Sequence, residues 1–343
     1  MALSKRSVLI AIVCIVGVAL AGAFFYVESI ISTRFNIEKT VYLYIDENKD
    51  YNSILKQLDT TAHVENLAKF KKVADYYDYP ENIKTGRYAI KPDMTIRDVV
   101  SLLKGGHQAP VKLKFNNIRT KDDLAVRLSS QLMFSKETIL SALNDSTRCA
   151  ALGFNVETID CMFIPNTYEV YWDVTLDNFL QRMHTEYNRF WNEDRKQKAK
   201  QQGLTPVEVS ILAAIVEEEC YFSDEYPMVA GLYLNRLRSG QMLQADPTVK
   251  YAVGDFSLKR ILFGHLQVDS PYNTYRHEGL PPGPIRVPSI KGIDAVLSAT
   301  KHNYLYMCAK EDFSGRHNFA VTHAEHVINA NKYRAALNTR GIK

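Results

Sequence analysis

The strongest local signal in this chain is a helix start at Thr205. Thr205 is a favoured N-cap residue, Pro206 suits the first helical position, and Glu208 completes a capping box. The apolar residues that follow recur at the spacing of one helical face, and they are Leu212, Ile215 and Val216. The pattern predicts a core helix, around which a domain of the chain must be packed.

Three consecutive glutamates end this helical pattern. Continuing its period places Glu219 near the middle of the apolar face, Glu217 almost opposite and Glu218 to the side. A carboxyl on a core face breaks the local pattern, and such breaks concentrate at functional sites. Burial would raise the pKa of Glu219, as a general acid working near neutral pH requires. The alternative is that the helix end frays and Glu219 points into a water-filled groove.

The N-terminal region contains a long uncharged segment, residues 7–27. A helix of that length spans roughly 31 Å, about the hydrocarbon thickness of a bilayer. The basic segment 1–6 precedes it and Glu28 follows, which predicts a transmembrane helix with a cytoplasmic N-terminus. A cleaved signal peptide is the alternative, because Ala19–Ala21 offers small residues, but the apolar run is longer than usual.

Composition excludes some function classes. The chain of 343 residues is 46% hydrophobic and 23% charged, which predicts an ordinary globular protein of about two domains. A net charge of +4, without a basic run that contains aromatics, argues against a nucleic-acid partner. The cysteines outside the apolar segment lack metal-binding spacing, so either disulfides or free buried thiols fit them. They are Cys149, Cys161, Cys220 and Cys308.

The sequence pattern of residues 38–106 predicts a small module with the order strand, helix, helix and strand, followed by a linker helix. The expected elements are strands 41–45 and 86–90 and helices 51–58, 64–77 and 96–104. This order resembles a LysM module, the small fold that binds glycans containing N-acetylglucosamine. The alternative is an α/β spacer that binds nothing.

The sequence pattern of residues 107–338 predicts a second domain that contains both helices and strands. The expected fold class is therefore α+β. The expected elements are a strand at 111–115 and helices at 120–132, 135–143, 176–202 and 223–238. The aromatic segment 162–172, which contains Glu169, suits the wall of a groove, although its aromatics fit a core as well. The helix at 176–202 is expected to be a solvated outer face.

Three loop-like clusters follow the glutamate helix, at 244–249, 270–275 and 279–285. Their Pro, Gly, Asn and Thr residues favour fixed loops that present hydroxyl and amide groups, which suit an uncharged polar ligand such as a sugar chain. The alternative is that these loops are scaffolding. The candidate ligand contacts are Gln244, Asp246, Thr248, Tyr272, Asn273, Thr274 and Tyr275.

Several motifs in one order resemble the endolytic murein transglycosylase family. They are IVEEE (215–219), NRL (235–237), LQADPTVKYA (243–252), SPYNTY (270–275), GLPPGPI (279–285) and HNFAVTHAEH (317–326). The resemblance implies cleavage of the β-1,4 bond between N-acetylmuramic acid and N-acetylglucosamine in nascent peptidoglycan strands, which leaves 1,6-anhydro ends and sets strand length. It also implies an inner-membrane anchor, a periplasmic catalytic domain and peptidoglycan synthases as partners.

The resemblance assigns catalysis to one glutamate without a cofactor. Glu219 takes the catalytic position and Glu217 a supporting one, while Asn273 is expected to hold the N-acetyl group or stabilise the transition state. Glu218 replaces the usual lysine, and repulsion among three acids is expected to raise a pKa further. Cys220 departs from the family pattern too.

Three alternatives belong to other classes. A muramidase would need a second carboxylate, such as Asp246 or Glu169. A non-catalytic glycan-binding scaffold of the wall-synthesis machinery would need no acid at all. A metal site would use histidines and a glutamate near the C-terminus, but their spacing is not that of HExxH, and the segment is not clearly helical from its sequence. Those residues are His317, His323, Glu325 and His326.

Overall fold

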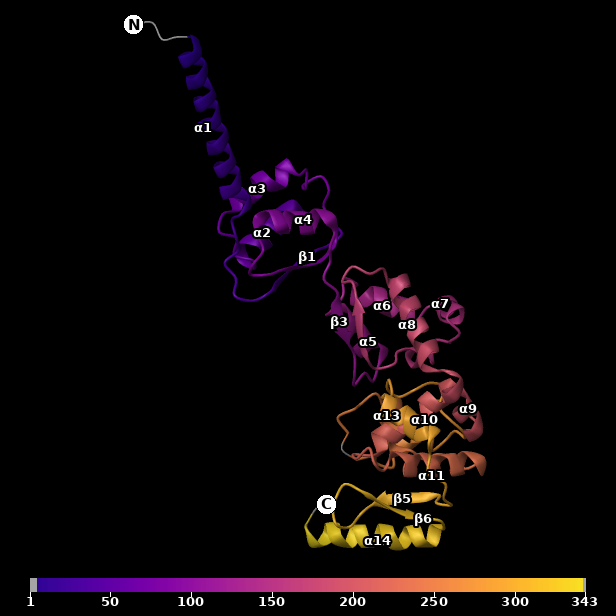
Figure 1. Ribbon diagram of the computed structural model, residues 1–343. Helices are drawn as coiled ribbons and strands as arrows, with labels where there is room; N and C mark the ends of the chain where they lie inside the picture. Colours follow the sequence, from indigo (N-terminus) through magenta and orange to yellow (C-terminus); the bar gives the residue numbers. More distant parts are fainter. Residues whose placement is uncertain (1–4, 259, 342–343) are drawn as a thin grey trace. The chain divides into compact units, whose positions relative to one another are not determined.

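The computed structural model describes residues 5–258 and 260–341 (Figure 1). The chain divides into two compact units. The first unit contains the chain up to Leu113 and two short segments, 131–133 and 168–174, and the second unit contains the rest. Of the expected cytoplasmic segment 1–6, residues 1–4 lie outside the described residues.

The N-terminal helix α1 (Lys5–Ile31) is apolar and exposed along most of its length. In the described part of the chain it is the one helix long and apolar enough to cross a membrane. It continues past the expected end at residue 27, because its last turn packs on the first unit. Ile30 joins that unit's core, and Lys69 donates to the Ser29 carbonyl at 2.8 Å.

The first unit has the order of elements that the sequence predicts. Its elements are β1 (Val41–Ile45), α2 (Tyr51–Thr60), α3 (Leu67–Tyr76), β2 (Gly86–Ile90) and α4 (Ile96–Gly105). Strands β1 and β2 pair antiparallel, with Leu43 opposite Tyr88, and both side chains are fully buried. Asp50 and Asn66 cap the two helices between the strands, which explains where each helix begins.

A second two-stranded sheet pairs β3 with β4, and short helices follow β3 in the chain. The elements are β3 (Val111–Lys114), α5 (Lys121–Ser129), α6 (Lys136–Leu143), α7 (Ser146–Ala151), the 3-10 helix η1 (Ile159–Met162) and β4 (Thr167–Val170). Thr120 and Asp123 form a capping box at the start of α5. This helix ends at Ser129, three residues before the expected end.

The single helix expected at 176–202 is wrong. The structure has α8 (Leu176–Phe190) and α9 (Glu193–Gln202), separated by a break. Trp191 is 1% exposed and leaves the helical path to reach the core, while Asn192 caps α9 through the Arg195 N–H. The expected solvated face describes α9, but α8 buries one side, including Phe179 and Met183.

Helix α10 (Pro206–Glu219) lies at the centre of the second unit. It packs against α11 (Tyr226–Arg238), α12 (Asp246–Val253) and α13 (Ile290–Leu297). The capping box predicted at Thr205 is confirmed. Residues 209–217 are all buried, so the helix has no solvent face along this stretch.

Two expected boundaries near α10 are wrong. Helix α11 begins at Tyr226 and not at Ser223, because Pro227 suits a first helical turn. The cluster at 244–249 is only partly loop, since α12 begins at Asp246 with Pro247 in its first turn. A short 3-10 helix, η2 (His265–Gln267), follows before the remaining two loop clusters.

The C-terminal segment forms a hairpin covered by a helix (Figure 1). Strands β5 (Tyr306–Ala309) and β6 (His317–Ala320) pair antiparallel, and α14 (His323–Thr339) packs on both. The stretch at His323 is therefore helical, contrary to expectation. Its start was readable, because Thr322 and Glu325 form a capping box.

At Gly231, helix α11 packs closely against the backbone of Thr300. A Cβ at this position would overlap the Thr300 carbonyl oxygen, which is a backbone atom and cannot move aside cheaply. Gly231→Ala is therefore expected to lower the free energy of unfolding by about 1–3 kcal/mol. Thermal denaturation beside Gly264→Ala, where a Cβ meets open space, checks this, and equal melting temperatures would contradict the packing.

Candidate active site

A cavity of about 320 Å³ opens at the C-terminal end of α10. Its lining comes from α10, α11, the loop before α12 and the first residue of α12, the 270–275 loop, the β5–β6 hairpin and α14. The polar and aromatic residues that line it are Glu219, Tyr233, Arg236, Gln244, Asp246, Tyr275, Tyr306, His317 and His326. The helix thus ends by presenting one carboxyl to a polar cavity.

Glu219 is that carboxyl, and its side chain is partly exposed to the cavity. The Tyr233 hydroxyl donates to its Oε1 at 2.7 Å. Burial, the largest cause, raises the pKa of Glu219 to about 7; the hydrogen bond from Tyr233 opposes this shift. The charges of Asp246 and Glu218 add small upward effects on this pKa. Near neutral pH the group can therefore either give or take a proton.

Glu217 points to the other side of the helix, but that side is buried too. Its side chain is 4% exposed and accepts hydrogen bonds from the Ser289 N–H, at 2.8 Å, and from the Ser289 hydroxyl. Arg286 Nε lies 3.5 Å from its Oε2. Glu217 therefore ties α10 to the N-cap of α13 and does not line the cavity.

Glu218 is neutralised by two arginines. Arg119 approaches one of its oxygens at 2.9 Å and Arg286 the other at 2.7 Å. The charge of Glu218 raises the pKa of Glu219, as the expected repulsion requires. It is, however, the smallest of the causes that shift the pKa of Glu219. Desolvation accounts for most of the shift instead.

Three of the expected ligand contacts line the cavity. Gln244 adopts a left-handed backbone conformation, with φ of 54°, and its side-chain oxygen accepts from Arg236 at 2.6 Å. The Tyr275 hydroxyl donates to Asp246 Oδ1 at 2.6 Å. Both pairs hold polar groups at fixed positions facing the same space as Glu219.

Three other expected contacts are buried, Thr248 in the first turn of α12 and Asn273 and Thr274 in the 270–275 loop. The Thr248 and Thr274 hydroxyls lie 2.8 Å apart, and Thr274 also accepts from the Ala245 N–H. Asn273 is 0% exposed, and its amide nitrogen donates to the Leu266 and Val268 carbonyls. These side chains hold the 270–275 loop against α12 and against residues 266–268, and they have no open face for a ligand.

The remaining two candidates lie outside this cavity lining. Tyr272 stands 4.7 Å from the ring of Tyr251, centroid to centroid, and packs against it. Glu169 lies on β4.

The sequence reasoning missed two residues of α11. Tyr233 holds the Glu219 carboxyl, and nothing in its local sequence distinguishes it from a core tyrosine. Arg236 lies in the NRL motif, and its guanidinium donates to the Met242 and Leu305 carbonyls as well as to Gln244. The sequence shows the motif, but it does not show which distant residues Arg236 contacts.

The C-terminal motif contributes a wall of the cavity. Tyr306 stacks on His326, with ring centroids 5.5 Å apart, and both line the cavity. His317 also lines the cavity, and its ring Nδ1 lies 3.3 Å from a carboxylate oxygen of Glu225. Within residues 5–258 and 260–341, no three His, Cys, Asp or Glu side chains group closely enough to hold a metal ion, and the five cysteines are free thiols.

Comparison with known proteins gives consistent matches. The sequence profile of the YceG-like family matches residues 43–332. An endolytic murein transglycosylase of Bacillus subtilis is 25% identical over 340 residues, covering 94% of this chain and 92% of that protein. A Streptococcus pneumoniae protein of the same name is 24% identical, and the match covers 84% of this chain but 58% of the longer relative.

A solved structure shares the fold. The crystal structure of a yceG-like protein from Listeria monocytogenes superimposes with a TM-score of 0.55 at 26% identity. The match covers 85% of this chain and 99% of the other.

Proposed function

Since this chain belongs to the YceG-like family, we propose that it is an endolytic peptidoglycan lytic transglycosylase. It cleaves the β-1,4 bond between N-acetylmuramic acid and N-acetylglucosamine within glycan strands. The names of the relatives support this activity. The observation that carries the proposal is Glu219, a carboxyl whose pKa is raised to about 7, held by Tyr233 in a polar cavity.

In the first step the protonated Glu219 gives its proton to the glycosidic oxygen. The bond from C1 of the muramyl sugar to that oxygen breaks, and positive charge develops at C1. A carboxyl with a pKa of about 7 is protonated in about half of the molecules at neutral pH, which suits this role.

In the second step the Glu219 carboxylate takes a proton from the sugar's own 6-hydroxyl. The 6-oxygen attacks C1 and closes the 1,6-anhydro ring, so the carboxyl is protonated again and no water is consumed. The hydrogen bond from Tyr233 stabilises the carboxylate between the two steps. One glutamate therefore serves as acid and then as base.

The other site residues divide into two groups by their surroundings. We assign glycan contact to Gln244, Asp246 and Tyr275, which line the cavity. Internal hydrogen bonds support a loop-holding role for Thr248, Asn273 and Thr274. Glu217, which bonds to α13, has a supporting role in positioning the end of α10.

The position of Asp246 supports a second candidate function, that of a muramidase. It lines the same cavity as Glu219, and the Tyr275 hydroxyl holds it in place. In a hydrolase Asp246 would activate water or stabilise the charge at C1. The two reactions differ in whether an oxygen atom from water enters the product.

The wider architecture is also part of the proposal. Helix α1 anchors the chain in the cell inner membrane, with the N-terminus cytoplasmic and the catalytic unit periplasmic. The β1–α2–α3–β2 module is LysM-like and binds the glycan, and peptidoglycan synthases are the partners whose strands are cut to length. An alkaline phosphatase fused to the C-terminus should be active in cells, and an inactive fusion would contradict this orientation.

The length distribution of the products tests the proposal. The purified full chain in detergent is incubated with long uncrosslinked glycan strands, which are sized by chromatography over time. Internal cleavage should shorten the mean strand early, before disaccharides accumulate. Steady release of disaccharides from long strands would contradict endolytic action, and unchanged strands would contradict catalysis.

Tyr233→Phe is expected to move the pH dependence of cleavage. The lost hydrogen bond lowers the pKa of Glu219 in the wild type, so its removal raises that pKa above about 7. The acid form then persists to higher pH, and the fall in kcat/KM on the alkaline side should shift upward in pH. Tyr76→Phe, on an exposed surface, is the control. A shift to lower pH, or none, would contradict the role of Tyr233.

A further inference from the structure

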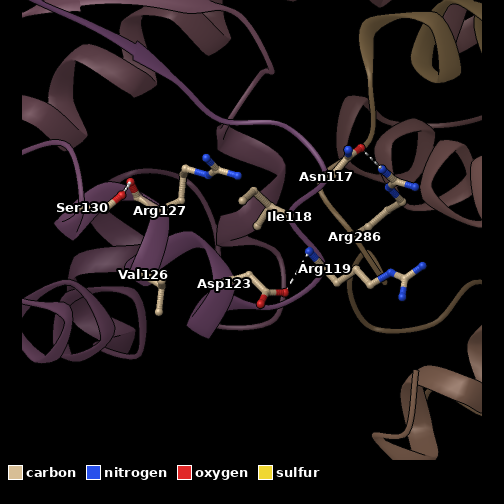
Figure 2. Close-up of a pocket in the computed structure, with 8 residues that line it drawn as sticks. All are labelled: Asn117, Ile118, Arg119, Asp123, Val126, Arg127, Ser130 and Arg286. Atoms are coloured by element: carbon tan, nitrogen blue, oxygen red, sulfur yellow. Dashed lines mark hydrogen bonds between the residues drawn. The ribbon is translucent and has the colours of Figure 1, made fainter. Parts of the chain in front are cut away.

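Some basic groups of this chain are balanced by acids within the protein. Arg119 and Arg286 line a cavity of about 670 Å³ in the catalytic unit (Figure 2), and both bond to Glu218. Their charges are therefore already paired. Two lysines of helix α3, in the first unit, are bonded to uncharged groups instead.

Lys69 and Lys72 of α3 contact helix α1 through neutral oxygen atoms. Lys69 donates to the Ser29 carbonyl at 2.8 Å, and Lys72 donates to the Tyr26 hydroxyl at 3.2 Å. Among the described residues, neither ammonium group is paired with a carboxylate. Glu28 is the acid in the last two turns of α1, so the two lysines leave a positive net charge beside the end of its apolar segment.

Helix α1 continues directly into the module of residues 41–105. Ile30 already belongs to the core of that module. Thr33 is 7% exposed, and its carbonyl accepts from the Ile96 N–H at 2.8 Å. Phe35 pairs with Val64 in a β-bridge. Bonds and packing therefore fix how the module is joined to α1, and Figure 1 shows α3 at the end of the first unit from which α1 leaves.

The length of α1 between the apolar segment and the module decides how far the module stands from a bilayer. The apolar segment ends at Val27, and Ile30 follows roughly 4.5 Å further along the helix axis. The polar layer on each side of the hydrocarbon is about 5–7 Å thick. If α1 spans the membrane, as proposed above, the part of the module around Ile30 lies within this layer.

The side of α3 next to α1 has side chains that suit such a layer. At 100° per residue, Lys69, Lys72 and Tyr76 fall within roughly 60° of one another, outside the buried face of the helix. Tyr76 is 81% exposed. Tyrosine concentrates at the level of the headgroups because its ring is apolar and its hydroxyl is polar, and lysine is attracted to anionic lipids.

We propose that α3 lies on the membrane surface where α1 ends, with Lys69, Lys72 and Tyr76 among the headgroups of anionic lipids. The module is then held against the bilayer and is not suspended from it by a free tether. The inference rests on the proposed membrane anchor and specifies which face of the module meets the membrane. A partner protein bound to this side of α3 would instead keep Tyr76 away from lipid.

The depth of position 76 in a bilayer tests this contact. The full chain with Tyr76→Trp is reconstituted in vesicles of phosphatidylcholine and phosphatidylglycerol that are brominated near the headgroup end of their acyl chains, which quenches tryptophan on contact. The wild type gives the background of Trp172 and Trp191. The fluorescence added by Tyr76→Trp should fall by about half or more. Tyr171→Trp, at another exposed position of the first unit, is the control and should be little quenched.

The lipid composition tests the lysines. At equal mole fraction, brominated phosphatidylglycerol should quench Tyr76→Trp about twofold more than brominated phosphatidylcholine, because the lysines attract anionic lipid. Adding Lys72→Gln should remove about half of this difference, since one of the two lysines is lost. Lys56→Gln, at an exposed lysine of α2, is the matched control. A difference that Lys72→Gln leaves unchanged would overturn the role of the lysine.

Flotation of the same vesicles separates this inference from the proposed function. A chain that floats with the vesicles while Tyr76→Trp is quenched no more than Tyr171→Trp would overturn the surface contact and leave the anchor in place. A chain that does not float would contradict the anchor itself. Strand cleavage in detergent is a separate measurement, because α3 contributes no residue to the lining of the Glu219 cavity.

Discussion

Glu219→Gln should lower the rate of strand cleavage by about a thousandfold and leave the protein folded. Glutamine cannot give a proton to the glycosidic oxygen or take one from the 6-hydroxyl, and acid–base catalysis of this kind contributes roughly 10²–10⁴-fold. The amide oxygen can still accept the hydrogen bond from Tyr233, so the local structure is kept. Cleavage is measured by chromatography of strands treated with equal amounts of each protein.

The stability of the same variant provides its control. The pKa of Glu219 is raised from 4.5 to about 7, so the folded wild type loses stability as pH rises from about 4.5 to about 7. Glutamine removes this loss, and the variant should be more stable than the wild type at pH 8 by about 1–3 kcal/mol, with no gain at pH 4. A variant that retains activity, or that is less stable at pH 8, would contradict the assignment.

Glu217→Ala should have the opposite profile, with a large loss of stability. The change removes the carboxylate that lies beside the Arg286 guanidinium in a buried site. It also removes the acceptor for the Ser289 N–H and hydroxyl. Breaking a buried ionic contact of this kind costs about 3–5 kcal/mol. Denaturant unfolding at neutral pH measures the loss.

The matched control is Glu193→Ala, whose side chain is 92% exposed beside Lys196. That substitution should change the free energy of unfolding by less than about 0.5 kcal/mol. A Glu217→Ala protein that is as stable as the wild type but inactive would place Glu217 in the chemistry and contradict its supporting role.

The central helix illustrates what a local pattern can predict. The capping residues at Thr205 act over three positions, so the helix start was readable from the sequence. The position of Glu217 was not, because periodicity separates two faces but cannot show that both are buried. Helix α10 is packed from several directions by α11, α12 and α13, and that packing is a tertiary property.

The loop residues show a second limit of local reasoning. The composition of the 270–275 loop indicates fixed turns, and the structure has them. Whether a polar side chain faces a ligand or another part of the chain depends on distant partners, such as Thr248 of α12 for Thr274. Asn273 and Tyr275 are two positions apart, yet one is buried and the other lines the cavity.

Residues far along the chain complete the cavity. Tyr306 and His326 reach the space around Glu219 because the C-terminal hairpin packs there, partly through the Arg236 bond to the Leu305 carbonyl. No local signal carries that information. The break at Trp191 depends partly on distant packing, since the indole is buried in the core, although Asn192, the N-cap of α9, is a local signal of it.

The most direct test of the central claim is the chemistry of the new strand ends. The full chain is incubated with uncrosslinked strands in water enriched in ¹⁸O, and the muramyl ends are examined by mass spectrometry. Catalysis by Glu219 alone predicts 1,6-anhydromuramyl ends that contain no ¹⁸O. Reducing ends that carry one ¹⁸O atom would show that water attacks C1, would require a second carboxylate such as Asp246, and would contradict the transglycosylase mechanism.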